Sequence, residues 1–137
     1  MRVPARICVA LVAALLLTVA GCGGKKTVTF TSTNWGTLEV GASKYNGAHV
    51  DITGQVFLVD LEQPDATWFG IYADVKGLTW RTIVEVPRPN FMIQENQIVH
   101  VVGVVDQTLP KPDSVLGFDV EPVILASKAT FIARPPG

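Results

Sequence analysis

The chain has 137 residues, enough for one domain of ordinary size and too few for two. It carries 11 basic and 12 acidic residues, and once Arg2 and Arg6 of a removable N-terminal stretch are set aside, nine basic residues against twelve acidic ones give a net charge of −3. This balance disfavours a non-specific nucleic-acid binder, and an apolar content of 48% with 9 prolines and 12 glycines excludes a disordered tail, a collagen and a coiled coil.

The first 21 residues have the arrangement of a secretory signal. Arg2 and Arg6 precede an apolar run over residues 7–18, and small residues follow at 19–21. The run is well short of the roughly 20 residues that a membrane-spanning helix needs. The sequence therefore predicts a cleavable signal helix over residues 1–21.

The residues around the cleavage point carry a more specific pattern. Val19-Ala20-Gly21-Cys22 resembles the lipobox of bacterial lipoprotein signals, in which an aliphatic residue, a small residue and Gly or Ala precede Cys. The resemblance implies cleavage before Cys22, a thioether-linked diacylglycerol on Cys22 and acylation of the new amino terminus. It places the domain on the extracytoplasmic side of the cell membrane or outer membrane, anchored in the lipid bilayer. The alternative is an ordinary signal in which Cys22 is incidental.

Cysteine usage limits the chemistry of the mature chain. Cys8, the other cysteine, lies in the signal, so no free thiol remains after Cys22 is lipidated. This excludes a disulfide framework, a cysteine nucleophile, a zinc ribbon and an iron–sulfur cluster, and we expect no cofactor.

Residues 22–33 are rich in Gly, Lys, Thr and Ser and predict a tether, 34–132 one domain, and 133–137 a tail. The domain begins with apolar residues at helical spacing, which predict a short N-terminal helix with Asn34 as its cap. Those apolar residues are Trp35, Leu38, Ala42 and Tyr45.

From residue 50 the period changes to two, which predicts strands. Val50, Ile52, Val56 and Leu58 form the buried side of the first strand, with Gly54 in its middle. Four further strands are predicted over 68–75, 81–86, 98–106 and 123–132, separated by proline-, glycine- and asparagine-containing turns.

The first and fourth strands share the pattern V-x-[IV]-x-G-x-V, over residues 50–56 and 99–105. A glycine in mid-strand permits the sharp coiling by which one strand serves both sides of a small barrel. Together with segments 45–49, 95–98 and 121–126, these strands resemble secreted bacterial OB-fold domains related to the tRNA-anticodon-binding type. The resemblance covers nearly all of 34–132 and implies an all-β, small five-stranded OB-like barrel. It departs from the family at 87–97, where two prolines leave room for little more than a turn in place of the usual helix.

In OB-like barrels, the second and third strands form the usual binding face. If Phe69, Ile71 and Ala73 point inward, then Trp68 and Tyr72 point outward. The candidate ligand-binding residues are therefore aromatic rings for stacking and one planar cation: Trp68, Tyr72, Trp80 and Arg81. The alternative is that these aromatic residues simply favour strands and shield a small core. The loop over 60–67 carries three acids, Asp60, Glu62 and Asp65, which would repel a polyanion.

Other chemistry finds little support in the sequence. His49 and His100 could join Asp51 and Glu85 in a metal site, but no local His spacing favours one, and we interpret them as half-exposed strand histidines with no metal. There is no G-x-S-x-G motif and no phosphate-binding glycine loop, so we expect no catalytic residues and no enzyme.

These observations predict a membrane-anchored, extracytoplasmic lipoprotein whose OB-like domain binds or scaffolds a protein or an envelope component such as a glycan. The alternative is binding of single-stranded nucleic acid or an oligosaccharide through the aromatic face of the second and third strands. The net acidity disfavours nucleic acid.

Overall fold

The computed structural model describes residues 28–74, 78–117 and 121–134. The predicted signal helix, Cys22 and the first half of the predicted tether lie outside the described residues.

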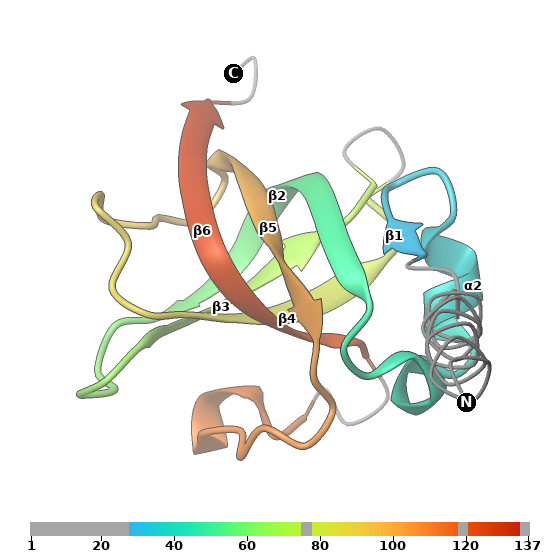
Figure 1. Cartoon of the computed structure of the whole chain (residues 1–137). Coiled ribbons are helices and arrows are strands. Elements are labelled where there is room, and N and C mark those ends of the chain that lie inside the picture. Colours follow the sequence, from blue (N-terminus) through green and yellow to red (C-terminus); the bar gives the residue numbers. More distant parts are fainter. Residues whose placement is uncertain (1–27, 75–77, 118–120, 135–137) are drawn as a thin grey trace, which may run out of the picture.

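Five strands close into one barrel (Figure 1). Around the barrel each strand pairs with the next in the order β2-β3-β4-β6-β5, and β5 pairs back onto β2. Only the β4–β6 pairing among them is parallel. The strands are β2 (His49–Asp60), β3 (Thr67–Tyr72), β4 (Arg81–Val86), β5 (Ile98–Val105) and β6 (Val123–Ala133). This is the strand order of an OB-like barrel, so the predicted fold class is confirmed.

The long strand β2 changes partners at its middle. Its first half pairs with β5 and its second half with β3, and Gln55 pairs with both Ile98 and Tyr72. Gly54 precedes this crossing point, and a Cβ built there would collide with the backbone oxygen of Tyr72. The sequence interpretation of Gly54 as the point where one strand serves two sides of the barrel therefore agrees with the register.

Gly103 marks an equally close approach on β5. A Cβ at Gly103 would collide with the backbone oxygen of Leu125 and lie 2.7 Å from the Cα of Ala126, both on β6. The register between β5 and β6 shifts by a residue between Val102 and Gly103. The missing side chain is what lets β6 approach at this irregularity.

A second irregularity corrects the predicted alternation on β2. The register with β3 shifts between Val56 and Leu58, which places Phe57 and Leu58 together outside the barrel. Val59, rather than Leu58, then packs against the main core. A β-bulge reverses the inward and outward sides of a strand, and strict alternation cannot anticipate it.

The N-terminal part of the domain differs from the expectation in two ways. The last residues of the predicted tether belong to the sheet, because β1 (Thr29–Phe30) pairs in parallel with the start of β2 and Phe30 is buried. The single predicted helix is broken into α2 (Trp35–Glu39) and a 3-10 turn, η1 (Ala42–Tyr45), because Gly41 between them is extended.

Asn34 stands at the start of α2 but makes no capping hydrogen bond there. Its side chain instead accepts from the Thr31 backbone N–H at 2.7 Å and donates to the Thr29 carbonyl at 3.1 Å. The predicted cap is therefore a brace that holds β1 against α2.

The main core fills the barrel and is closed by two segments outside the five strands. α2 and the β4–β5 connection lie on opposite sides of the barrel (Figure 1). Trp35 and Leu38 of α2 and Ile93 of the connection all belong to the main core. As the prolines predict, residues 87–97 contain no helix. Ile93, 1% exposed, brings an apolar side chain from this helix-free connection into the core.

Candidate functional site

The outer face of β3 and β4, predicted as the binding face, is covered by the chain itself. Trp68 points outward as alternation predicts, yet it is only 4% exposed. It packs in a second apolar cluster with Ile83 and Val115. Val115 belongs to a short 3-10 turn, η2 (Asp113–Val115), in the β5–β6 connection. Trp68 borders a depression of about 300 Å³ beside Leu109 and Pro110, but with 4% of it exposed it offers too little ring surface for a ligand to stack on.

Tyr72 is half-buried farther along the same face. Its ring lies 4.8 Å from that of Phe57, centroid to centroid, at an angle of 42°. The Phe57 ring also covers Gly70, where a Cβ would lie 2.5 Å from its edge. The two outward aromatic residues of β3 thus pack against the protein's own side chains.

Trp80 and Arg81 lie where β4 begins. Trp80 is half-buried against the main core, and its ring lies 3.7 Å from the place where a side chain on Gly36 of α2 would start. The Arg81 guanidinium forms an ion pair with Glu121 at 2.8 Å, with 49% of the Arg81 side chain and 7% of the Glu121 side chain exposed. The structure brings Trp80 and Arg81 beside α2 and sets them apart from the covered Trp68.

A second carboxyl group lies near this ion pair. Burial, followed by the charge of Glu121, raises the pKa of Glu39 on α2 to about 7, and Trp35 and Arg81 oppose the rise. Trp35 Nε1 lies near Glu39, but the two do not reach hydrogen-bond geometry, and both Trp35 Nε1 and Glu39 Oε1 are buried without a partner. Glu39 is therefore held in a position that disfavours its charge at neutral pH.

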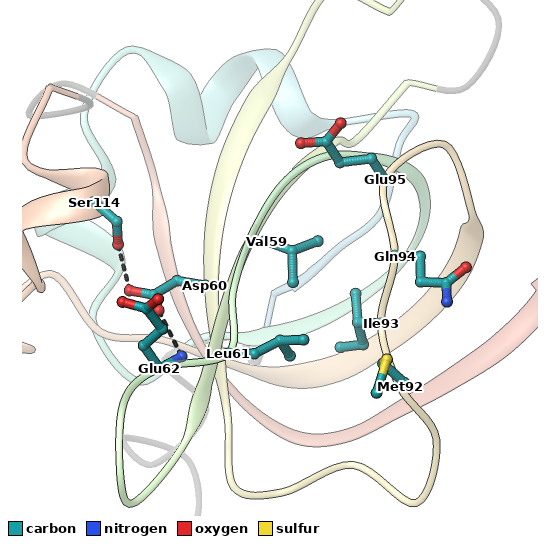
Figure 2. Close-up of a pocket in the computed structure, with 9 residues that line it drawn as sticks. All are labelled: Val59, Asp60, Leu61, Glu62, Met92, Ile93, Gln94, Glu95 and Ser114. Atoms are coloured by element: carbon teal, nitrogen blue, oxygen red, sulfur yellow. Dashed lines mark hydrogen bonds between the residues drawn. The ribbon is translucent and has the colours of Figure 1, made fainter.

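An open hollow lies on the other flank, between the end of β2 and the β4–β5 connection (Figure 2). We call it the acidic hollow; its volume is about 500 Å³. Apolar side chains gather at its centre and carboxyl groups lie at its margins, with Glu95 on one side and Asp60 and Glu62 on the other. Its lining residues are Val59, Asp60, Leu61, Glu62, Met92, Ile93, Gln94, Glu95 and Ser114.

Hydrogen bonds fix one wall of the acidic hollow. The Ser114 hydroxyl donates to Asp60 Oδ2 at 2.5 Å, the Gln63 side chain donates to the same oxygen at 3.1 Å, and the Glu62 backbone N–H donates to Asp60 Oδ1 at 2.9 Å. These donors, Ser114 first, lower the pKa of Asp60, although burial opposes them. Asp60 is thus a fixed negative charge, and its bond to Ser114 also holds η2 over Trp68.

A neighbouring depression continues the acidic hollow. It shares Leu61 and Met92 with the hollow and has a volume of about 460 Å³. Thr67, Phe91 and the 88–90 turn form the rest of its lining. Arg88 lies at this rim and donates to the Pro64 carbonyl at 2.9 Å.

The two histidines lie apart from these sites. His100 Nε2 lies 2.6 Å from Asp51 Oδ1 on the neighbouring strand, and both side chains are partly exposed. His49 lines a different, apolar depression over β5 and β6. Glu85, on β4, is the remaining acid of the predicted set, and burial raises its pKa. Within the described ranges, no group of three or more His, Cys, Asp or Glu residues could hold a metal ion.

Sequence reasoning missed the acidic hollow as a site. The sequence shows the acidic character of Asp60 and Glu62, but it indicates only a loop that would repel a polyanion. The partners opposite them, Met92 to Glu95, come from an irregular connection whose course no periodicity predicts.

Comparison with solved structures supports the barrel. The chain is similar in structure to a protein described as an aspartyl-tRNA synthetase from Leishmania major Friedlin, with a TM-score of 0.53 and 10% sequence identity. The match covers 82% of this chain and 22% of that one, so this chain spans about a fifth of the synthetase. At this identity the likeness shows the fold alone: an OB-like barrel.

No protein-family model matches the sequence, and no curated protein matches it. Among the residues that the structure describes, no helix is both long and apolar enough to cross a membrane.

Proposed function

We propose that this chain is a non-catalytic binding module, an OB-like barrel held on the extracytoplasmic side of a bacterial membrane by lipid on Cys22, and that it binds a protein of the cell envelope. The lipid anchor rests on Val19-Ala20-Gly21-Cys22 after a short apolar run. Two or three acyl chains anchor far more firmly than one, since each buried methylene contributes about 0.8 kcal/mol.

The observation that carries the binding proposal is the contrast between two surfaces. The face that OB-like barrels use for single strands and sugars is closed by η2 and by Phe57, so stacking on Trp68 requires part of the fold to open. The acidic hollow is open, with apolar side chains exposed at its edge. A protein segment can fill such a surface, whereas a phosphate polymer is repelled by its carboxylates.

The likeness to a tRNA synthetase adds no activity to this proposal. It concerns one barrel that spans 22% of that protein, and a fold shared at 10% identity hosts many unrelated functions. Aminoacylation is therefore not proposed for this chain.

Mass spectrometry of the protein purified from its native membrane tests the anchor. We expect a mature N-terminus at Cys22 that carries acyl chains, and we expect the Cys22→Ala chain to remain unlipidated. An unmodified N-terminus at any other residue would contradict the anchor.

A binding comparison tests the choice of partner. The purified chain is titrated with single-stranded DNA, RNA, glycans and envelope proteins at low and high salt. We expect binding to an envelope protein that Tyr72→Ala and Arg81→Ala leave unchanged. Salt-sensitive binding to single strands that both substitutions abolish would instead establish the aromatic face as a nucleic-acid site.

A further inference from the structure

The acidic hollow combines exposed apolar surface with a depression that can hold it. Leu61 is 50% exposed and Met92 65% exposed, and the two side chains lie at the boundary between the hollow and the neighbouring depression. Ile93, fully within the core, forms the floor between them. Flexible methionine side chains beside a depression suit a site that adapts to an inserted apolar group.

The charged side chains that line the acidic hollow are all acidic, and Arg88 belongs to the neighbouring depression. Asp60, Glu62 and Glu95 line it, and no lysine or arginine is among its lining residues. Glu62 and Glu95 are exposed, and they lie on opposite sides of the apolar centre (Figure 2). Asp60 is held ionised by the donors described above. A bound group therefore meets an apolar centre between negative margins.

The size of the acidic hollow limits its occupant. A volume of about 500 Å³ accommodates one or two side chains of an extended segment, and is too small to receive a folded surface. Arginine and lysine suit these margins because their aliphatic stems lie along apolar surface while the cation stays at the rim.

We propose that the acidic hollow binds an extended segment of a partner protein in which an apolar residue is flanked by lysine or arginine. The apolar residue packs against the exposed side chains of Leu61 and Met92, and the cations pair with Glu62 and Glu95. This inference rests on the proposed function as a protein-binding module and gives it a site and a partner chemistry. Complementary charge sets the register and raises the association rate of such a segment.

Fluorescence anisotropy with two matched peptides tests the proposal. The full-length chain is placed in phosphatidylcholine nanodiscs, whose neutral lipid does not attract the peptides, and empty nanodiscs give the background. The probes are labelled peptides of identical length, one alternating lysine with leucine and the other alternating glutamate with leucine. We expect the lysine peptide to bind, with an affinity that falls as salt rises, and the glutamate peptide to stay at background.

Charge-reversal variants assign the binding to the acidic hollow. Glu62→Lys/Glu95→Lys should weaken the lysine peptide by roughly fivefold or more, because two exposed attractions become repulsions. Met92→Ser should weaken it through lost apolar contact. Asp51→Lys, the matched control, reverses an exposed charge on β2 that pairs with His100 and does not line the hollow, and it should leave the affinity within about twofold of wild type.

The outcomes separate this inference from the proposed function. Equal binding of the lysine peptide by wild type and Glu62→Lys/Glu95→Lys would overturn the assignment to the acidic hollow. Binding of neither peptide, or of both equally, would overturn the partner chemistry. Neither result bears on the lipid anchor or on the envelope-protein titrations, which use no peptide and decide the proposed function independently.

Discussion

Replacing Gly103 with alanine should weaken the barrel at the seam between β5 and β6. The added Cβ would meet the backbone oxygen of Leu125 and the Cα of Ala126, which cannot rotate away as a side chain could. Overpacking of this kind costs about 1 to 3 kcal/mol, and it outweighs the 0.4 to 1 kcal/mol, roughly, that Gly→Ala gains by restricting the unfolded chain.

The measurement is thermal unfolding of the full-length chain in neutral detergent, followed by near-UV circular dichroism. For a domain of about 100 residues, a loss of 1 to 3 kcal/mol lowers Tm by roughly 5 to 20 °C. Gly54→Ala should behave alike, because its Cβ meets the backbone oxygen of Tyr72.

Gly117→Ala is the matched control. Among the described residues other than its chain neighbours, none has an atom within 4 Å of the place where its Cβ would stand, so Tm should stay the same or rise slightly. If Gly103→Ala and Gly117→Ala melt at the same temperature, the close approach of β6 to β5 does not require glycine and the reasoning fails.

Three further substitutions test the covered face and the two carboxyl sites. Because Trp68 is buried, Trp68→Ala should lower the free energy of unfolding by about 3 to 5 kcal/mol, as measured by denaturant unfolding. A decrease of less than about 1 kcal/mol would mean that η2 does not cover Trp68. The folded-state pKa of Glu39 is about 7, against an ordinary 4.5, so its contribution to stability is complete below pH 4.5 and is lost as pH rises through 7. Glu39→Gln should therefore raise Tm at pH 8 more than it does at pH 4. A change in Tm that is the same at both pH values would contradict this reasoning. The pKa of Asp60 is lowered in the folded protein, so its contribution to folding stability is present above pH 3.8 and is lost as pH falls below that value. Ser114→Ala should lower Tm at pH 7, and the difference from wild type should become smaller in acid. An unchanged Tm at pH 7 would show that the hydrogen bond from Ser114 to Asp60 contributes nothing to stability.

The strands could be predicted from the sequence because their signals are local. Alternation located β4 at residues 81–86 and set the start of β5 at Ile98 and of β6 at Val123, as the structure has them. The glycine in the V-x-[IV]-x-G-x-V pattern, which the first and fourth strands share, indicated the barrel, because a close backbone approach requires glycine and a glycine can be recognised in a single sequence.

The candidate surfaces could not be predicted, because each depends on where an irregular segment runs. Alternation gave the correct direction for Trp68 but could not show that Val115, 47 positions later, would cover it. The carboxyl group of Glu39 meets Glu121 and Arg81 only through the tertiary fold, and the acidic hollow forms only because Ile93 turns into the core. Side chains outside regular elements follow no period, so their meetings appear first in the structure.

The closing pairings of the barrel determine how it must fold. β2 joins β5 through Gln55 and Ile98, and β4 joins β6 through Ile83 and Val123, so each pairing links positions about forty residues apart. Pairings of such long range impose a loop-closure entropy before they contribute contacts, and all-β chains of this kind fold in roughly milliseconds to seconds. Until β5 and β6 pair with the sheet, the hairpins of β2, β3 and β4 have unpaired edges, so aggregation competes with folding before the barrel closes. Substitutions that slow closure will therefore reduce the yield of folded protein even where they leave the equilibrium stability of the closed barrel unchanged.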